Sequence, residues 1–345
     1  MAFSMLEMVV LGIFMSIMLL VTVIGNLLVI LAFVTDEPLR TVSNYYLLNL
    51  AIADLLIGCF CIPVYIPYIL TGEWTGGRPL CLIWLTVDYV VCTASTLNIM
   101  LISWDRYMLV TRGLSYHASQ TTKKAIIHMA VVWVLATLLY GPAILFWERL
   151  AGRRLVLDNE CFVEFYDNFP FKLTAAMVEF VTPLVSLSYF NVSIYLNIRW
   201  RSRGGFLTSE RQKTCFGICG TSKTTTGSGS NEITANSSQN QRNTTHQSSL
   251  KRDKKTAKSL AILVGVFSLC WSPYTLLTLV LSLCPNCVNS HLYELAFWLL
   301  WLNSTVNPFI YQWCHKRFQY AFHKILCSWR KNRIHPSSTS PDNSN

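Results

Sequence analysis

Long apolar stretches with almost no charged residues recur along this chain, separated by short polar segments. Seven such runs lie at about 8–35, 41–70, 79–103, 125–147, 173–198, 259–283 and 292–314. Each is long enough to cross a bilayer as an α-helix, which takes about 20 residues. The pattern predicts an all-α membrane protein, a bundle of seven transmembrane helices whose two termini lie on opposite faces of the membrane.

The third run carries an acidic residue near each of its ends. Asp88 and Asp105 lie 17 positions apart with no charge between them. At about 1.5 Å per residue this spacing spans roughly 26 Å, close to the thickness of a bilayer's hydrocarbon core. Because ionisable residues in such a segment are costly, they indicate function. We expect Asp88 to meet a cation at one face and Asp105 to belong to a switch at the other.

Composition and charge agree with a membrane protein. The chain is 52% hydrophobic and only 13% charged, against about 25% charged in soluble domains. The net charge of +10 comes from one face, since all Lys and Arg except Arg78, Arg149, Arg153, Arg154 and Lys172 fall in alternate loops. The positive-inside bias makes that face cytoplasmic, with the N-terminus outside. This distribution argues against nucleic acid as a partner.

Residues 204–250, between the fifth and sixth runs, are rich in Ser, Thr, Gly and Asn. Such a composition predicts a disordered cytoplasmic loop within a domain of residues 1–328, and residues 329–345 are predicted to be a disordered tail. Basic clusters at 199–203 and 251–258 flank the loop. They suit either a topology signal and lipid anchor or an acidic cytosolic partner, and both interpretations stay open.

Cysteines divide by location. Cys81 and Cys161 both fall on the outer, oxidising face, which predicts a disulfide between them. Cys284 and Cys287 form a CxxC pair in the last outer loop, where a loop disulfide is favoured over a metal or redox site. Cys327 follows an amphipathic stretch at 318–326, which predicts palmitoylation and a short eighth helix on the inner membrane lipid surface.

Asp54 lies near mid-membrane in the second run. It is either a hydrogen-bonded structural acid or the holder of a cation or proton. A carboxylate at that depth costs about 2.5–3.5 kcal/mol, which favours a bound ion. Oxygens for an allosteric Na⁺ are available from Ser95, Asn303, Ser304 and Asn307. No other metal or cofactor is expected.

Prolines interrupt the fifth, sixth and seventh runs at Pro183, Pro273 and Pro308. Each removes one backbone hydrogen bond and kinks its helix. Kinks beside a polar core are natural hinges.

One motif in each of the seven runs, in order, resembles the rhodopsin-like family of G-protein-coupled receptors. The matching residues are Gly25-Asn26, Leu50 to Asp54, Cys81 with Cys161, Asp105-Arg106-Tyr107, Trp133, Pro183, Cys270-Trp271-Ser272-Pro273 and Asn307-Pro308-Phe309-Ile310-Tyr311. The resemblance covers residues 10 to about 328 apart from the 204–250 loop. It implies a plasma-membrane receptor and no enzyme activity.

Asp88, seven residues after Cys81, resembles the amine-binding aspartate of the family's biogenic amine receptors. A carboxylate there can hold an ammonium by a charge-assisted hydrogen bond of about 2.7–2.9 Å. The resemblance places further ligand-binding residues around it, with aromatic rings for cation–π attraction. They are Tyr65, Tyr89, Cys92, Phe162, Trp271, Tyr274, Thr275, Phe297 and Trp301.

Glu179, four residues before Pro183, is a second acid in the fifth run. Two acids suit a ligand with an amine at one end and an imidazole N–H at the other. In this pair of acids the chain resembles histamine receptors of the third and fourth types. The strings at 65–68, 139–145, 193–198 and 297–301 are similar to the third type especially, and Leu300 favours the third over the fourth. The alternative for Glu179 is a structural acid bonded to a neighbouring helix.

The resemblance implies coupling to inhibitory Gi/o heterotrimeric G proteins, lowering cyclic AMP, with arrestin and receptor kinases as further partners. It implies a switch built from Asp105, Arg106, Tyr107, Asp253, Phe267, Pro273, Pro308 and Tyr311. Where the wider family usually has a tyrosine, Asn191 stands here, from which we expect altered basal activity.

The pattern has three alternative interpretations. A receptor for another biogenic amine keeps the class and changes the ligand, and Glu179 discriminates it. A retinal pump or opsin needs a lysine in the seventh run, and none lies between His291 and Lys316. An intramembrane aspartyl protease using Asp54 and Asp88 would need both carboxylates at one depth, which their runs do not allow.

Overall fold

The computed structural model describes the backbone of residues 5–218, 232–284, 286–314 and 316–334, and their side chains apart from Leu114, Thr256, Cys314, 203–253 and 328–334. These ranges hold helices and no strand. The α-helices are α1 (Met5–Thr35), α2 (Val42–Leu56), α3 (Ile62–Thr71), α4 (Gly77–Arg112), α5 (Leu114–Ser119), α6 (Thr122–Ala151), α7 (Phe169–Ala176), α8 (Thr182–Ile218), α9 (Glu232–Leu283), α10 (Ser290–Cys314) and α11 (Lys316–Ile334). Three short helical segments join them, η1 (Glu37–Leu39), η2 (Ile57–Cys61) and η3 (Met177–Val181).

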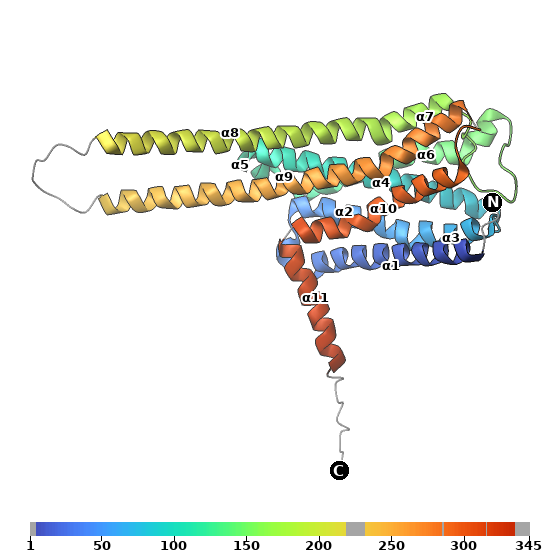
Figure 1. The fold of residues 1–345 in the computed structure, drawn as a ribbon, viewed down its shortest axis with the longest axis horizontal. Coiled ribbons are helices and arrows are strands. Elements are labelled where there is room, and N and C mark those ends of the chain that lie inside the picture. Colours follow the sequence, from blue (N-terminus) through green and yellow to red (C-terminus); the bar gives the residue numbers. More distant parts are fainter. Residues whose placement is uncertain (1–4, 219–231, 285, 315, 335–345) are drawn as a thin grey trace, which may run out of the picture.

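The long helices run side by side as one bundle, and α11 leaves it at a steep angle (Figure 1). Helix α4 lies at the centre, because it packs against α2, α6 and α8 and also touches α9. Asp88 and Asp105, near the two ends of α4, are both buried, with 2% and 1% of their surface exposed. The bundle therefore has two functional ends, here called the disulfide end, where Cys81 is bonded to Cys161, and the Arg106 end.

Six described helical stretches are long and apolar enough to cross a membrane, where the sequence predicts seven spans. The seventh predicted run corresponds to α10. Asn303, Ser304 and Asn307 lower the hydropathy of α10, yet all three are buried, each no more than 2% exposed. Helix α10 tolerates these polar side chains because they face the other helices and not the lipid.

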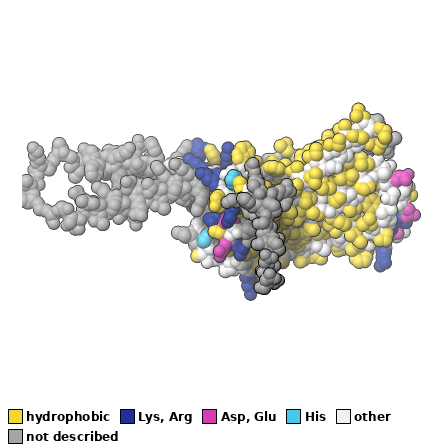
Figure 2. All heavy atoms as spheres, turned by 90° about the horizontal axis from the view of Figure 1, so that it is seen from below, with side chains coloured by type: hydrophobic (Ala, Val, Ile, Leu, Met, Phe, Trp, Pro, Cys, Tyr) yellow, Lys and Arg dark blue, Asp and Glu magenta, His cyan; other side chains and the backbone are white. Residues whose placement is uncertain are grey.

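Apolar side chains also cover the outside of the bundle. Ile13, Leu138, Val185 and Leu276 are each more than half exposed. Figure 2 shows hydrophobic side chains over the middle of the described surface, Lys and Arg gathered at one end and several acidic side chains at the other. A surface of this kind suits hydrocarbon between two polar boundaries.

Polar side chains link helices inside the bundle. The Asn49 amide donates to Asn98 Oδ1 at 2.8 Å and its oxygen accepts from Trp133 Nε1 at 3.0 Å, which joins α2, α4 and α6. The Thr22 and Thr305 hydroxyls lie 2.7 Å apart and join α1 to α10. Hydrogen bonds of this kind hold helices together where lipid tails supply no hydrophobic drive for association.

Both π-helical segments end two residues before a proline. Segment η2 precedes Pro63 and η3 precedes Pro183. Proline has no N–H to bond the carbonyl four residues earlier and its ring crowds that carbonyl, so the preceding turn is under strain to widen. In η3 the affected carbonyl belongs to Glu179. The π turn thus changes the rotation of α7 relative to α8 beside a predicted ligand-binding acid.

The polar segment between the fifth and sixth spans differs in part from the prediction. Helix α8 continues to Ile218 and α9 begins at Glu232, so backbone helix extends into the predicted disordered range from both ends. Residues 219–231 lie outside the described residues, and for them disorder stays a prediction. Helix α11 contains the predicted amphipathic stretch and continues to Ile334, so residues 329–334 are helical where the sequence predicts a disordered tail.

The close approach of α1 to α10 requires glycine at position 25. A Cβ added to Gly25 would lie 3.0 Å from Pro308 Cγ, whereas one added to Gly265 would have no atom within 4 Å. We predict that Gly25→Ala lowers the free energy of unfolding by about 1–3 kcal/mol, the usual cost of overpacking. Thermal unfolding in nanodiscs measures it, at about 2–4 °C per kcal/mol for chains of 150–250 residues.

Gly265→Ala is the matched control, because both substitutions bring the same change in helix propensity. Equal unfolding temperatures for the two variants would show that the Gly25–Pro308 contact does not limit the packing of α1.

Candidate functional site

A cavity of about 400 Å³ opens at the disulfide end of the bundle. It lies between α4, the α7–η3 segment, α9 and α10, with residues from α3, α6 and the loop after α6 completing its wall. Nine of the predicted ligand-binding residues line it, namely Tyr65, Asp88, Tyr89, Phe162, Glu179, Trp271, Tyr274, Thr275 and Phe297. The structure thus brings together residues from six separate parts of the sequence.

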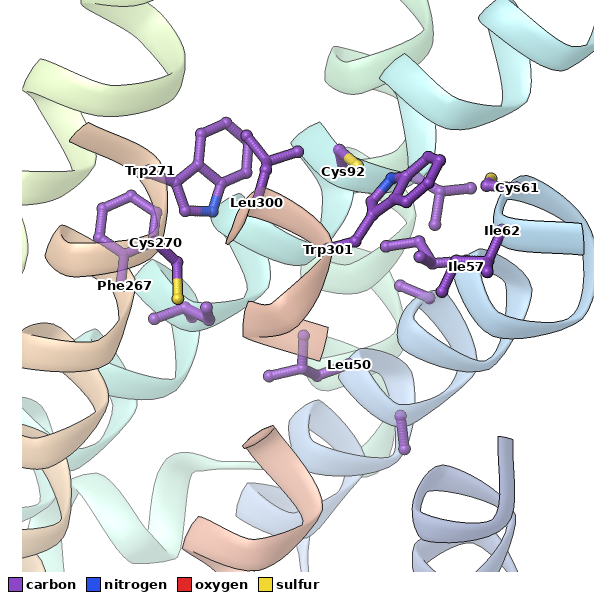
Figure 3. Close-up of a cluster of buried hydrophobic side chains, with 14 of the residues drawn as sticks. Leu50, Ile57, Cys61, Ile62, Cys92, Phe267, Cys270, Trp271, Leu300 and Trp301 are labelled. Carbon is purple, nitrogen blue, oxygen red and sulfur yellow. The ribbon is translucent and has the colours of Figure 1, made fainter. Parts of the chain in front are cut away.

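Asp88 projects from α4 into this cavity and is held by α10. Trp301 Nε1 donates a 2.9 Å hydrogen bond to Asp88 Oδ1, and the Cys92 thiol lies 3.9 Å from the same oxygen. Trp301 is fully buried, and Figure 3 shows its side chain and that of Trp271 pointing into the bundle from α10 and α9. One carboxylate oxygen of Asp88 is therefore held by side chains behind it, and the carboxylate group faces the cavity.

Glu179 faces the same cavity from the π-helical segment η3. Its Oε2 accepts a 2.6 Å hydrogen bond from the Tyr140 hydroxyl of α6, and its Oε1 accepts one from the Thr93 hydroxyl of α4. Hydrogen bonds to a carboxylate in a low-dielectric site are stronger than neutral ones and fix its position. Asp88 on α4 and Glu179 on η3 are thus two acids of the cavity that hydrogen bonds hold in place on different elements.

Aromatic rings fill the space beside Asp88. Tyr65 stacks on Trp84 with centroids 5.1 Å apart, and it lies 5.3 Å from Phe297 and 5.4 Å from Trp301. The hydroxyls of Tyr89 and Tyr274 lie 3.3 Å apart and join α4 to α9 across the cavity. Ring faces around a carboxylate favour a compact organic cation.

The loop after α6 is tied down over the cavity. The disulfide between Cys81 and Cys161 confirms the predicted pairing and places Phe162 at the cavity wall. Arg78 forms ion pairs with Glu148 of α6 and Glu164 of the loop. A second disulfide joins Cys284 and Cys287 beyond the end of α9.

Two predicted ligand-binding residues, Cys92 and Trp301, do not line the cavity. Both are buried behind Asp88, Cys92 one helical turn further along α4 and Trp301 on α10. They contact the acid through the bonds described above, so their effect on a ligand passes through Asp88. The resemblance places both residues near Asp88 and does not show that other side chains separate them from the cavity.

Sequence reasoning missed several residues of the cavity. Tyr140 lies in the string at 139–145, which is similar to histamine receptors of the third type but does not mark this tyrosine as a partner of an acid. Thr93 is one of several hydroxyl-bearing residues on α4. Lys172 and Glu294 also line the cavity, and the Tyr65 hydroxyl donates to both Glu294 oxygens at 3.2 and 3.0 Å. A charged residue at the outer end of a span was a signal for Lys172 and Glu294, but Tyr140 and Thr93 had none.

Ser95 and Asn307, two of the residues predicted for an ion site, bond to Asp54 between α2, α4 and α10. Asp54 is fully buried and accepts hydrogen bonds from Ser95 Oγ at 3.0 Å and Asn307 Nδ2 at 2.8 Å. Among the described atoms, the side-chain oxygens of Asn303 and Asn307 are buried without a hydrogen-bond partner. A carboxylate with a hydroxyl and free amide oxygens is a donor set that a hard cation prefers.

At the Arg106 end, Asp105 is held by a short helix that follows α4. The Tyr116 hydroxyl of α5 donates to Asp105 Oδ1 at 3.0 Å. Burial, together with the charge of Asp105, raises the pKa of Tyr116 well above its usual value, so the hydroxyl stays protonated and remains a donor. Sequence reasoning did not identify Tyr116 as a partner of Asp105.

Other predicted switch residues gather nearby. Arg106 and Tyr311 line a small cavity of about 20 Å³ with Leu260 and Leu263 of α9. Tyr107 stacks on Phe190 of α8 with ring centroids 5.3 Å apart.

Between the two ends, Phe267 packs below Trp271 at 5.7 Å. Helix α9 continues through Pro273, and α10 continues through Pro308. The side chain of Asp253, another predicted switch residue, lies outside the described residues.

A bundle of seven spans with a cavity at one end and the Asp105-Arg106-Tyr107 motif at the other defines a class of membrane receptor. The chain matches the model for the 7 transmembrane receptor (rhodopsin family) over residues 25–311, and it belongs to that family. It is accordingly a multi-pass receptor of the plasma membrane and not an enzyme, as the sequence predicts.

The similarity to individual receptors extends over most of the chain. It is 39% identical to the histamine H4 receptor of Homo sapiens over 364 alignment positions, covering 92% of each protein. It is 39% identical to the histamine H4 receptor of Mus musculus, covering 88% of each. The muscarinic acetylcholine receptor M1 of Homo sapiens is 31% identical, covering 93% of this chain and 90% of that receptor.

The hydrogen bond between Tyr140 and Glu179 is testable by a double-mutant cycle. We predict that Tyr140→Phe lowers the free energy of unfolding by about 1–3 kcal/mol, because a buried acid loses a donor. In a Glu179→Gln background the same substitution should cost less, with a coupling energy between 0.5 and about 3 kcal/mol. Thermal unfolding of the four proteins measures both values.

Tyr320→Phe on the exposed face of α11 is the control for loss of a tyrosine hydroxyl. A coupling energy of zero would mean that the two side chains do not stabilise each other.

Proposed function

We propose that this chain is a cell-surface histamine receptor that couples agonist binding to inhibitory Gi/o heterotrimeric G proteins. The observation that carries the proposal is the pair of oriented carboxylates, Asp88 and Glu179, in one cavity. The similarity to receptors named for histamine, and more distantly to one named for acetylcholine, supports an amine as the ligand.

The geometry of the cavity supports a role for each acid in binding the ligand. Asp88 takes the primary ammonium of histamine, next to the rings of Tyr65 and Phe297. Glu179 takes an imidazole N–H, held in place for this purpose by Tyr140 and Thr93. A cavity of about 400 Å³ accommodates so small a ligand with room for larger amines. Another biogenic amine with a hydrogen-bond donor at its far end is the second candidate.

Activation requires the two acids to bind histamine more tightly in the active arrangement, since a ligand shifts an equilibrium only by its differential affinity. We propose that α9 swings outward about the Pro273 kink and opens a cleft beside Arg106 for the G protein. This assigns the disulfide end to the outside of the cell and the Arg106 end, with its basic flanks, to the cytoplasm. Arrestin and receptor kinases would use the same face.

Within the histamine receptors, the type is a finer prediction. The similarity to histamine H4 receptors supports the branch that contains the third and fourth types. The sequence-based preference for the third type depends on strings such as 193–198 and on Leu300. Leu300 is only 5% exposed and does not line the cavity, so its effect on ligand choice would act through packing.

The first test is G-protein activation by the purified receptor, measured as nucleotide exchange on Gi, with histamine against serotonin, dopamine and acetylcholine. We predict that histamine is the most potent. Asp88→Asn should weaken it roughly 30-fold or more, because removing one partner of a buried charge pair costs about 2–5 kcal/mol. Glu179→Gln should weaken histamine far more than 2-phenylethylamine, which has the amine but no imidazole N–H.

Glu73→Gln, an exposed acid at the same end, is the matched control and should leave both potencies unchanged. If another amine is most potent, or if histamine acts equally on Glu179→Gln, the ligand assignment is wrong while the receptor class stands.

We also propose that Asp54 with Ser95 and Asn307 holds an allosteric Na⁺. An ion that binds only the folded state stabilises it by RT ln(1 + [Na⁺]/Kd), about 1.4 kcal/mol at ten times Kd. Replacing K⁺ by Na⁺ at constant ionic strength should therefore raise the unfolding temperature of the receptor. In Asp54→Asn this rise should disappear, while Asp158→Asn, an exposed acid, should keep it. An equal rise in all three proteins would show that the ion acts elsewhere.

A further inference from the structure

A second hollow in the described part of the chain is larger than the ligand cavity and separate from it. It is a groove of about 860 Å³ between α8 and α9 near the Arg106 end, and these helices lie side by side in Figure 1. Its walls include Val192, Tyr195 and Arg199 of α8 and Lys254, Lys258 and Ala261 of α9.

The groove opens to the outside of the bundle. On α8 the buried side is marked by Leu187 and Ile194, both fully buried, whereas Val192 and Tyr195 in the groove are 57% and 56% exposed. On α9 the buried Leu260 and Leu263 face the small cavity beside Arg106 and not the groove. Ile198, which is 4% exposed, also lines the groove, so the groove extends from the packed side of α8 to the flank of the bundle that faces lipid.

Its position along the helices coincides with the end of the membrane spans. The candidate span through α8 ends at Ser202, and the one through α9 begins at Ala257. Arg199, Lys254 and Lys258 lie within four residues of these boundaries. Asn191, at the other end of the groove, is 11 residues before Ser202 and so about 16 Å deeper in the span. The groove thus has a cationic end at the boundary and an apolar wall that enters the hydrocarbon.

The three cations are available for a ligand. Among the described side chains no acid forms an ion pair with Arg199, Lys254 or Lys258. Lys258 lies 5.8 Å from the centre of the Trp313 ring of α10, a contact that leaves its ammonium exposed. Three like charges around one groove repel one another and favour a multivalent anion between them.

We propose that this groove binds an acidic phospholipid, with the headgroup held by Arg199, Lys254 and Lys258 and one acyl chain along Val192, Tyr195 and Ala261. The basic flanks of the loop between α8 and α9 then anchor lipid as well as setting topology. Since α8 and α9 separate when α9 swings, an occupant of the groove would respond to the state of the receptor. The proposal does not depend on which amine the receptor binds, and acidic lipids are enriched in the leaflet that the proposed orientation gives this end.

A lipid fits the groove better than an acidic segment of a cytosolic protein. Such a segment could reach Arg199 and Lys254 at the boundary. It would have to bury backbone N–H and C=O groups to follow the wall towards Asn191, which is costly in hydrocarbon. An acyl chain meets no such cost and matches the exposed apolar surface.

The test is native mass spectrometry of the full-length receptor, which counts the bound phosphatidylserine molecules. The receptor is first reconstituted in nanodiscs of phosphatidylcholine that contain increasing amounts of phosphatidylserine. Arg199→Gln, Lys254→Gln and Lys258→Gln should each weaken binding about fivefold, and the triple variant by on the order of 100-fold, from about 1 kcal/mol per basic residue. A phosphatidylserine with a photoreactive acyl chain should label the peptides that contain Val192 and Ala261.

The matched control is the triple variant Lys123→Gln, Lys316→Gln and Lys324→Gln, which removes the same charge at the same end but outside the groove. It should keep the bound lipid, and unchanged unfolding temperatures establish that all variants fold. Ala261→Trp fills the apolar wall and leaves the cations in place, so it should also lose the lipid.

Three outcomes would overturn the proposal. The first is phosphatidylserine retained by the groove triple variant. The second is soluble phosphoserine competing as well as the lipid, which would make the site one for free phosphate. The third is an acidic peptide that displaces the lipid and still binds Ala261→Trp, which would assign the groove to a protein partner.

Discussion

Burying carboxylates in an apolar bundle is the constraint on which the rest of this structure depends. An acid in hydrocarbon is tolerated only when other groups supply hydrogen bonds, and in a helix the backbone donors are already used. The partners must therefore come from side chains of other helices. Asp88 receives one from Trp301 of α10, and Glu179 receives two, from Tyr140 of α6 and Thr93 of α4. Each acid consequently links spans that are distant in sequence, and its hydrogen bonds depend on how those spans pack.

This arrangement makes the ligand cavity sensitive to the packing of the bundle and the packing sensitive to a ligand. A cation that binds Asp88 competes with, or reinforces, the hydrogen bond from Trp301. Below the cavity, Trp271 packs on Phe267, and α9 continues to Leu260 and Leu263 beside Arg106. Packed interiors change between discrete arrangements and not continuously, so a small change at the acids can be passed along α9 as a rigid element. The π turn in η3 beside Glu179 and the kinks at prolines provide the places where such changes occur.

The sequence predicted the class of the fold correctly, and nine of the eleven residues that it predicts for ligand binding line the cavity. Span positions follow from hydropathy, and the depth of Asp88 and Asp105 follows from helical rise. The same reasoning was weakest for α10, whose mean hydropathy is lowered by Asn303 and Asn307. Hydropathy does not show which face of a helix is turned inwards. It placed Trp301 at the cavity surface, whereas the side chain is buried behind Asp88. It missed Tyr140 altogether, because nothing in a single helix marks a tyrosine as the partner of an acid on the next span.

The division between the two sources of information has a physical basis. Backbone hydrogen bonds within a helix and the thickness of a bilayer are local or external constraints, so the spans, their order and the depth of each acid can be derived from the chain of residues. The rotation of each helix about its axis is set by contacts with neighbours that are remote in sequence. The partners of Asp88, Glu179 and Asp105, the shape of the cavity and the outward-facing groove between α8 and α9 all depend on that rotation. They are therefore properties of the packed bundle and became visible only in the three-dimensional structure.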